Sequence, residues 1–163
     1  MKKKILLIAV IMAAVFTGCS GKTEDKETNG ENNTTETVAV TDLLGREVEV
    51  PDDVESVIAL GAGGLRMLCY ADAQDMVIGV ENGEHEKTLA KCYNYVYNDI
   101  FKELPVVGTG GSGSYEAYEE EILKLAPDVI FASYPEDLAD DLQSKTGIPV
   151  VVVTYDGGMF DEK

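Results

Sequence analysis

The chain has 163 residues, enough for an export signal and one globular domain with its own apolar core. It carries 30 acidic and 13 basic residues, a formal net charge of −17 at pH 7. Because nucleic-acid binding depends on Lys and Arg contacts to phosphate, this charge excludes a nucleic-acid-binding module. It is typical instead of a solvated, mutually repulsive surface.

Residues 1–18 are typical of an export signal. Three lysines precede the apolar run 5–16, which is shorter than the roughly 20 residues that a membrane span needs. Cys19 follows the small residue Gly18, and this ending resembles a lipobox. The resemblance implies cleavage before Cys19, lipidation of its thiol and an extracytoplasmic protein anchored to the cell membrane. A simple cleaved leader and a stub of membrane helix are the alternatives.

A flexible tether is predicted over residues 19–37. The segment is rich in Gly, Asn, Thr and Glu and contains no aromatic residue, so it cannot bury enough apolar surface to offset the entropy of ordering. Such a tether lets a domain sample the space above a membrane. Residues 38–163 are the predicted folded domain.

The domain opens with a predicted β-hairpin over residues 38–51, in which Gly45 supplies the unusual turn dihedral. A strand over 56–60, a helix over 64–71 and a strand over 75–80 follow. Strands that alternate with helices indicate a parallel sheet.

The second half continues this alternation. A helix is predicted over residues 115–125, with Ser114 as its N-cap, and another over 136–145. The runs 128–132 and 149–153 are continuously apolar, which predicts two central strands buried on both faces. The fold class is therefore α/β, a parallel β-sheet flanked by helices, with an N-terminal β-hairpin.

Ligands of such sheets sit beyond the carboxyl ends of the strands, so the turn after residues 56–60 is a candidate site. It contains Gly61, Gly63 and Gly64. Arg66 stands where a dinucleotide-binding fingerprint needs its third glycine, so that match is weak. Free amides at the helix start suit an anionic ligand edge, and Arg66 could reinforce them. Pairing of Arg66 with Asp72 or Asp75 is an equal alternative.

Other strand ends supply further candidates. The predicted ligand-binding residues there are Glu81, Gly110, Gly111, Ser112, Tyr134 and Tyr155. The alternative for the glycine-rich segment 108–113 is a linker without contacts. One of Tyr93, Tyr95 and Tyr97 could line a cleft, although packing at the core edge is the simpler interpretation.

Metal and thiol chemistry have little support. With His85 as the one histidine, a dedicated transition-metal site is not expected, and no metal or cofactor is predicted. Cys69 and Cys92 are expected to be buried as small apolar residues and not to form a disulfide.

Three ordered motifs carry a family resemblance: Leu-Pro-Val-Val-Gly at 104–108, Leu-Ala-Pro-Asp-Val-Ile at 125–130 and Thr-Gly-Ile-Pro-Val-Val at 146–151. From about residue 38 onward the chain resembles the amino-terminal lobe of the periplasmic-binding-protein family. The branch concerned delivers iron-siderophore, haem and cobalamin-type chelates to ABC importers. The resemblance implies reversible capture of a ferric chelate, haem or cobalamin, with ABC permease subunits as partners.

Family members offer acidic groups to their permease. The candidates here are Glu116, Glu119, Glu120, Glu121, Asp137, Asp140 and Asp141. Alternatively, these residues only solvate exposed helix faces. The family also binds its ligand between two lobes, and this sequence matches one of them, so a truncated product, a fragment or a single-lobe variant is expected.

An enzyme is not predicted, because the sequence lacks a Gly-x-Ser-x-Gly elbow, a phosphate-loop lysine motif and a plausible Cys and His pair. Two other functions remain as alternatives to solute capture. One is a surface scaffold or adhesion lobe without a transport role, and the other is a small hydrolase.

Overall fold

The computed structural model describes residues 36–111, 113 and 115–153. The predicted signal, Cys19 and most of the tether lie outside these residues, as do Ser112, Ser114 and Tyr155. Within them, no helix is long and apolar enough to cross a membrane. The elements are β1 (Thr37–Thr41), β2 (Glu47–Pro51), β3 (Val57–Leu60), α1 (Gly64–Tyr70), η1 (Gln74–Met76), β4 (Val77–Glu81), η2 (Asn82–Glu84), α2 (Cys92–Phe101), β5 (Val106–Thr109), β6 (Glu116–Ala117), α3 (Glu119–Leu125), β7 (Val129–Ala132), α4 (Glu136–Thr146) and β8 (Val150–Val152).

The predicted hairpin is present. β1 and β2 pair antiparallel, with Thr37 opposite Pro51 and Thr41 opposite Glu47. Gly45 adopts a φ of 81°, the left-handed conformation that the turn requires. Asp42 closes the turn by accepting hydrogen bonds from the backbone N–H groups of Leu44 and Arg46, both at 3.0 Å.

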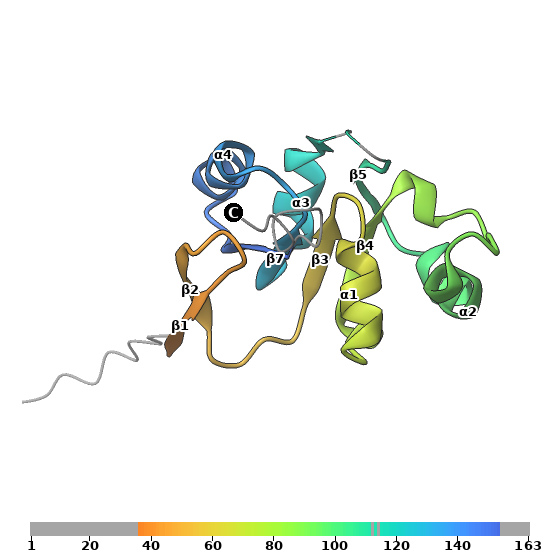
Figure 1. The fold of residues 1–163 in the computed structure, drawn as a ribbon, viewed down its shortest axis with the longest axis horizontal. Helices are drawn as coiled ribbons and strands as arrows, with labels where there is room; N and C mark the ends of the chain where they lie inside the picture. The colour runs from red at the N-terminus through yellow and green to blue at the C-terminus, as the bar shows by residue number, and fades with distance from the viewer. Residues whose placement is uncertain (1–35, 112, 114, 154–163) are drawn as a thin grey trace, which may run out of the picture. The chain divides into compact units, whose positions relative to one another are not determined.

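The main sheet has six strands in the order β6-β5-β4-β3-β7-β8 (Figure 1). All neighbours pair in parallel except β5 and β6, which are antiparallel. The α/β class predicted from the sequence is confirmed. The βαβ unit is also confirmed, since β3 and β4 lie side by side with α1 between them in the chain.

The helix predicted over 115–125 starts later, at Glu119, with Tyr118 as its N-cap. The prediction that Ser114 caps this helix is therefore wrong. The N–H of Tyr118 donates to the carbonyl of Val107 at 2.8 Å, and Glu116 pairs with Thr109. Because β5 offers open backbone groups at the sheet edge, pairing with it holds residues 116–118 extended and overrides the local helical pattern.

β7 is central, as predicted, but β8 is the last strand of the described sheet, so the prediction of two central strands is wrong for β8. Its apolar run has another cause, since the hairpin turn covers its outer edge. The Leu43 N–H donates to the Val152 carbonyl at 3.2 Å, and the Val152 N–H donates to Asp42 Oδ2 at 3.2 Å. The strand is buried along its length although it ends the sheet.

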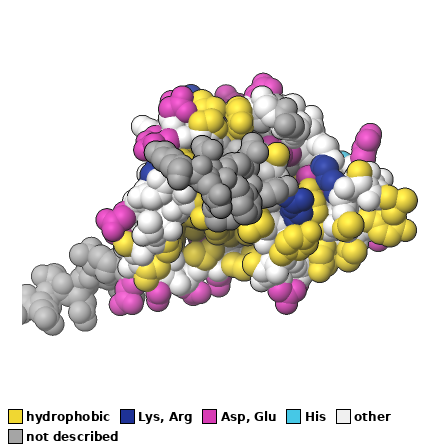
Figure 2. Space-filling model, in the orientation of Figure 1, with side chains coloured by type: hydrophobic (Ala, Val, Ile, Leu, Met, Phe, Trp, Pro, Cys, Tyr) yellow, Lys and Arg dark blue, Asp and Glu magenta, His cyan; other side chains and the backbone are white. Residues whose placement is uncertain are grey.

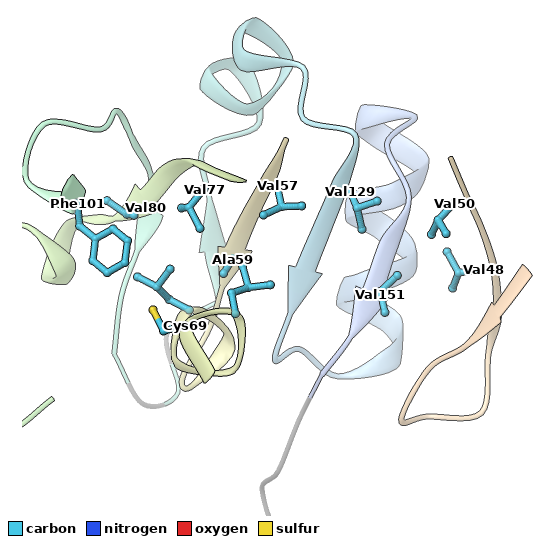
Figure 3. Packing of buried hydrophobic residues seen from close by; sticks show 12 residues of the cluster. Val48, Val50, Val57, Ala59, Cys69, Val77, Val80, Phe101, Val129 and Val151 are labelled. Atoms are coloured by element: carbon cyan, nitrogen blue, oxygen red, sulfur yellow. The ribbon is translucent and has the colours of Figure 1, made fainter. Parts of the chain in front are cut away.

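Apolar side chains fill both faces of the sheet. Along β3, Val57 and Ala59 belong to one cluster, while Ile58 and Leu60 belong to the other, as the two-residue repeat of a strand requires. The first cluster includes residues of α1, α2 and β2, and the second includes residues of α3 and α4. Figure 3 shows side chains of the first cluster spread along the sheet. The helices therefore cover both faces and leave the strand ends to form a site.

Candidate functional site

The carboxyl ends of β3, β4 and β5 meet around the side chain of Glu81, the last residue of β4. Glu81 is 6% exposed, and its Oε1 accepts a hydrogen bond from the Gly61 N–H at 2.8 Å. A Cβ at Gly110 would lie 3.2 Å from Glu81 Oε2. Of the glycines predicted to touch a ligand, Gly61 therefore donates to this buried carboxyl group and Gly110 leaves room for it.

Gly61 also contacts the end of β7. It has a φ of 80°, and a Cβ there would lie 3.0 Å from the carbonyl oxygen of Ser133 and 3.2 Å from the ring of Tyr134. A larger residue would meet both the strained backbone and this contact. The neighbouring Gly63 caps α1 with a φ of 90°.

The environment of Glu81 favours its neutral form. Burial raises the pKa of Glu81 to about 7, because the carboxylate loses hydration. The Gly61 N–H lowers this pKa, the nearby Glu84 raises it and Lys91 lowers it. The carboxyl group therefore changes its charge near neutral pH.

Glu84 is a second buried acid, 6% exposed, and both of its carboxylate oxygens accept hydrogen bonds. Its Oε1 accepts from Lys91 Nζ at 2.6 Å and from the Tyr93 hydroxyl at 2.9 Å. Its Oε2 accepts from Asn94 Nδ2 at 3.1 Å. Asn94 and Asn98 also donate to the Glu84 carbonyl oxygen, at 2.8 and 3.2 Å. This network fastens the segment after β4 to α2.

A pocket of about 320 Å³ lies at these strand ends, between the start of α1 and the start of α2. The pocket brings together five of the predicted residues, namely Gly61, Gly63, Arg66, Glu81 and Gly111. It is also lined by Ala62, Tyr70, Glu84, Ala90, Lys91, Cys92 and Tyr93. Figure 2 shows Lys and Arg side chains next to hydrophobic ones on one face of the molecule.

The remaining predicted residues lie elsewhere. Gly64 packs α1 against the sheet, since a Cβ there would lie 3.5 Å from the Ala59 side chain. Tyr134 is buried, and its ring meets Tyr115 edge-to-face at 5.2 Å. Gly110 contacts Glu81. Ser112 and Tyr155 lie outside the described residues, so their roles stay predictions.

The structure separates the three tyrosines. Tyr93 lines the pocket, whereas Tyr95 is exposed beneath the Lys87 ammonium group at 4.8 Å. Tyr97 packs against Phe101 with a centroid distance of 6.2 Å. Sequence reasoning missed Glu84 and Lys91 as lining residues. Their position in the sequence, just after the strand β4, could have predicted this, because the loops beyond strand ends surround the site.

Cys69 and Cys92, the cysteines within the described part of the chain, are both free, and they differ in environment. Cys69 is buried in the core, as predicted. Cys92 is exposed at the start of α2, so the prediction of burial is wrong for it. His85 Nε2 lies 3.0 Å from the Leu104 carbonyl oxygen. Among residues 36–111, 113 and 115–153, no group of three or more His, Cys, Asp and Glu side chains could hold a metal ion.

No family model matches this sequence. The chain is 28% identical over 126 residues to the molybdate-binding protein MolA of Haemophilus influenzae, which covers 76% of the chain and 34% of MolA. The solved structure of MolA bound to molybdate, a periplasmic binding protein, matches with a TM-score of 0.57 and 27% identity over 72% of the chain and 34% of MolA. The chain is similar to a lobe of a periplasmic solute-binding protein. The resemblance predicted from the sequence is thus confirmed.

Other solved structures agree in fold. The petrobactin-binding protein YclQ of Bacillus subtilis matches with a TM-score of 0.54 and 22% identity over 74% of the chain and 39% of YclQ. The haem-binding protein HmuT matches with a TM-score of 0.51 and 22% identity over 74% of the chain and 35% of HmuT. The chain therefore spans about a third of the length of these proteins.

Proposed function

We propose that this chain is the solute-capturing lobe of an ABC importer and that it binds an anionic iron chelate of the siderophore type reversibly. The observation that carries the proposal is the pocket at the carboxyl ends of the parallel strands, where Arg66 and Lys91 supply positive charge. Ligands of open α/β sheets bind at this edge. No bond is made or broken in this function, so the chain acts as a binding protein.

The lining suits a chelate. Arg66 can recognise paired ligand oxygens with its planar guanidinium group, and Tyr70 and Tyr93 offer aromatic faces with polar tips. A pocket of about 320 Å³ lies at the lower end of the range for sites that enclose drug-sized ligands. A second lobe that closed over the pocket would complete the enclosure.

A second candidate ligand is molybdate, favoured by the similarity to MolA. A molybdate ion is a compact dianion that needs only hydrogen-bond donors and positive charge. Arg66, Lys91 and the backbone amides near Gly63 are donors of that kind on the pocket wall. The two candidates share an anionic, oxygen-rich surface and differ in size.

The proposal extends to anchoring and to the permease. Cys19 would carry the lipid and hold the protein outside the cell membrane. Among the acidic candidates for permease contact, Glu119 and Glu121 form exposed ion pairs with Lys145 and Lys124. Loss of membrane retention in Cys19→Ala, measured by fractionation, would support the anchor, and unchanged retention would argue against it.

Calorimetric titration of the full chain tests the proposal. The panel contains ferric hydroxamate and catecholate siderophores, haemin, cobalamin and molybdate. We expect Arg66→Ala to weaken binding of the preferred solute about 10-fold or more, because charged hydrogen bonds contribute about 1.5–3 kcal/mol. Lys102→Ala, on an exposed turn with its pair Asp99, is the matched control.

Three outcomes separate the functions. Tight binding of a panel member by the folded chain supports solute capture, and the preferred member identifies the class. Turnover of a small ester or phosphate instead supports a hydrolase. A folded chain that neither binds nor reacts supports a surface scaffold and overturns the proposal.

A further inference from the structure

The pocket has a carboxyl group in its wall that an anionic solute must meet. Glu81 is almost entirely buried, yet it lines the pocket together with Arg66 and Lys91. The Gly61 N–H donates to its Oε1, and a Cβ at Gly110 would lie 3.2 Å from its Oε2. The hydrogen bond from Gly61 therefore orients the carboxyl group in the pocket wall.

The charge of the described pocket wall depends on Glu81. The wall contains two cationic side chains, Arg66 and Lys91, and two acidic side chains, Glu81 and Glu84. Glu84 Oε1 pairs with the Lys91 ammonium group at 2.6 Å. Ionised Glu81 adds a negative charge to this wall, whereas neutral Glu81 does not. An anion is therefore bound more readily when Glu81 is neutral.

The groups around Glu81 come from several elements. Glu84 at the end of η2 opposes its ionisation, and Lys91 in the following loop favours it. Burial raises the pKa of Tyr134, which follows β7, and the charge of the nearby Glu81 raises it further. Burial outweighs these charges and holds the pKa of Glu81 at about 7.

We propose that Glu81 is the specificity-determining residue of this pocket and engages an anionic, oxygen-rich solute as a neutral acid that donates its proton to a solute oxygen. This inference rests on the proposed function. The ligand class is then one whose oxygens accept a hydrogen bond at Glu81 while Arg66 neutralises its charge. Binding takes up one proton when Glu81 is ionised beforehand.

Proton uptake makes affinity depend on pH. If only the neutral acid binds the anion, affinity follows the neutral fraction of Glu81, which falls about 10-fold between about pH 6 and about pH 8 for a pKa of about 7. The dissociation constant should rise by the same factor. Glu81→Gln keeps an oxygen for the Gly61 N–H and a permanent donor, so its affinity should stay near the low-pH value of the wild type.

The experiment titrates the full chain with molybdate and with an anionic ferric hydroxamate complex at about pH 6, 7 and 8, in buffers of different ionisation enthalpy. We expect uptake of up to one proton and about 10-fold weaker binding at about pH 8. Glu81→Gln should remove both effects. Glu103→Gln, an exposed acid outside the pocket, should retain both.

The outcomes separate this inference from the proposed function. If a probe binds the wild type with the same affinity at all three pH values and without proton uptake, the role of Glu81 is wrong and solute capture stands. Tighter binding of either anion at high pH would also overturn it, since the ionised form of Glu81 would then favour binding. If neither probe binds wild type or Glu81→Gln at any pH, solute capture of these anions fails, and the inference fails with it.

Discussion

Removal of Asp42 should destabilise the fold strongly, through the contact between the hairpin and the sheet. Its side chain is inaccessible, and it accepts five hydrogen bonds. Three come from the backbone N–H groups of Leu44, Arg46 and Val152, and two from the Arg46 guanidinium at 2.9 and 2.7 Å. Asp42→Ala leaves all five donors without this acceptor.

The expected loss is large, because the guanidinium of Arg46 is only 12% exposed. Removing one partner of a buried ion pair costs about 3–5 kcal/mol. Arg46 retains Asp140 and the Val150 carbonyl as partners, which places the loss at about 3 kcal/mol, the lower end of that range. The outer edge of β8 should loosen as well, since the turn supplies its outer hydrogen bonds.

Urea unfolding of the full chain, followed by circular dichroism, measures this loss. The control is Asp53→Ala, an exposed acid beyond β2, which should stay within about 0.5 kcal/mol of the wild type. A loss below about 1 kcal/mol for Asp42→Ala would refute the reasoning, since the contact would then be no stronger than a surface ion pair.

Three further predictions follow from the same contacts. Burial would raise the pKa of Asp42, but hydrogen bonds from Arg46 and Val152 lower it overall, so the stabilisation by Asp42 should be lost as the pH falls below about 4. Urea unfolding at acid pH should therefore show a smaller difference in stability between the wild type and Asp42→Ala. Burial raises the pKa of Glu81, so folding is opposed at high pH, where the buried carboxyl group has to ionise. Glu81→Gln should therefore stabilise the chain by about 3 kcal/mol at about pH 8 and far less at about pH 5, and equal effects at the two pH values would contradict this. Exposed Cys92 should react with a maleimide in the native chain, whereas Cys69, whose pKa burial raises to about 11, should react only after unfolding, as mass spectrometry after digestion would reveal.

Local patterns in the sequence were sufficient where neighbours along the chain decide the structure. The apolar runs at 57–60 and 129–132 form central strands. Gly45, in the turn that joins β1 and β2, and Gly147, at the end of α4, adopt the left-handed conformation. These elements depend on side-chain period and backbone sterics, which a short window of sequence contains. The alternation of strands with helices then determined the α/β class and the edge of the sheet on which to look for a site.

Tertiary structure decided the rest, because the deciding contacts join residues far apart in the chain. Pairing with β5 kept residues 116–118 out of the helix, and the turn at Asp42 closed the edge of β8, about 110 residues away. Likewise, Gly61 faces a carboxyl group that follows it by 20 residues, and burial at that meeting point raises the pKa of Glu81. A residue's type and its neighbours along the chain do not reveal how far distant segments desolvate it. The sequence alone therefore determined the arrangement of strands and helices, and only the folded chain determined the electrostatics of the pocket.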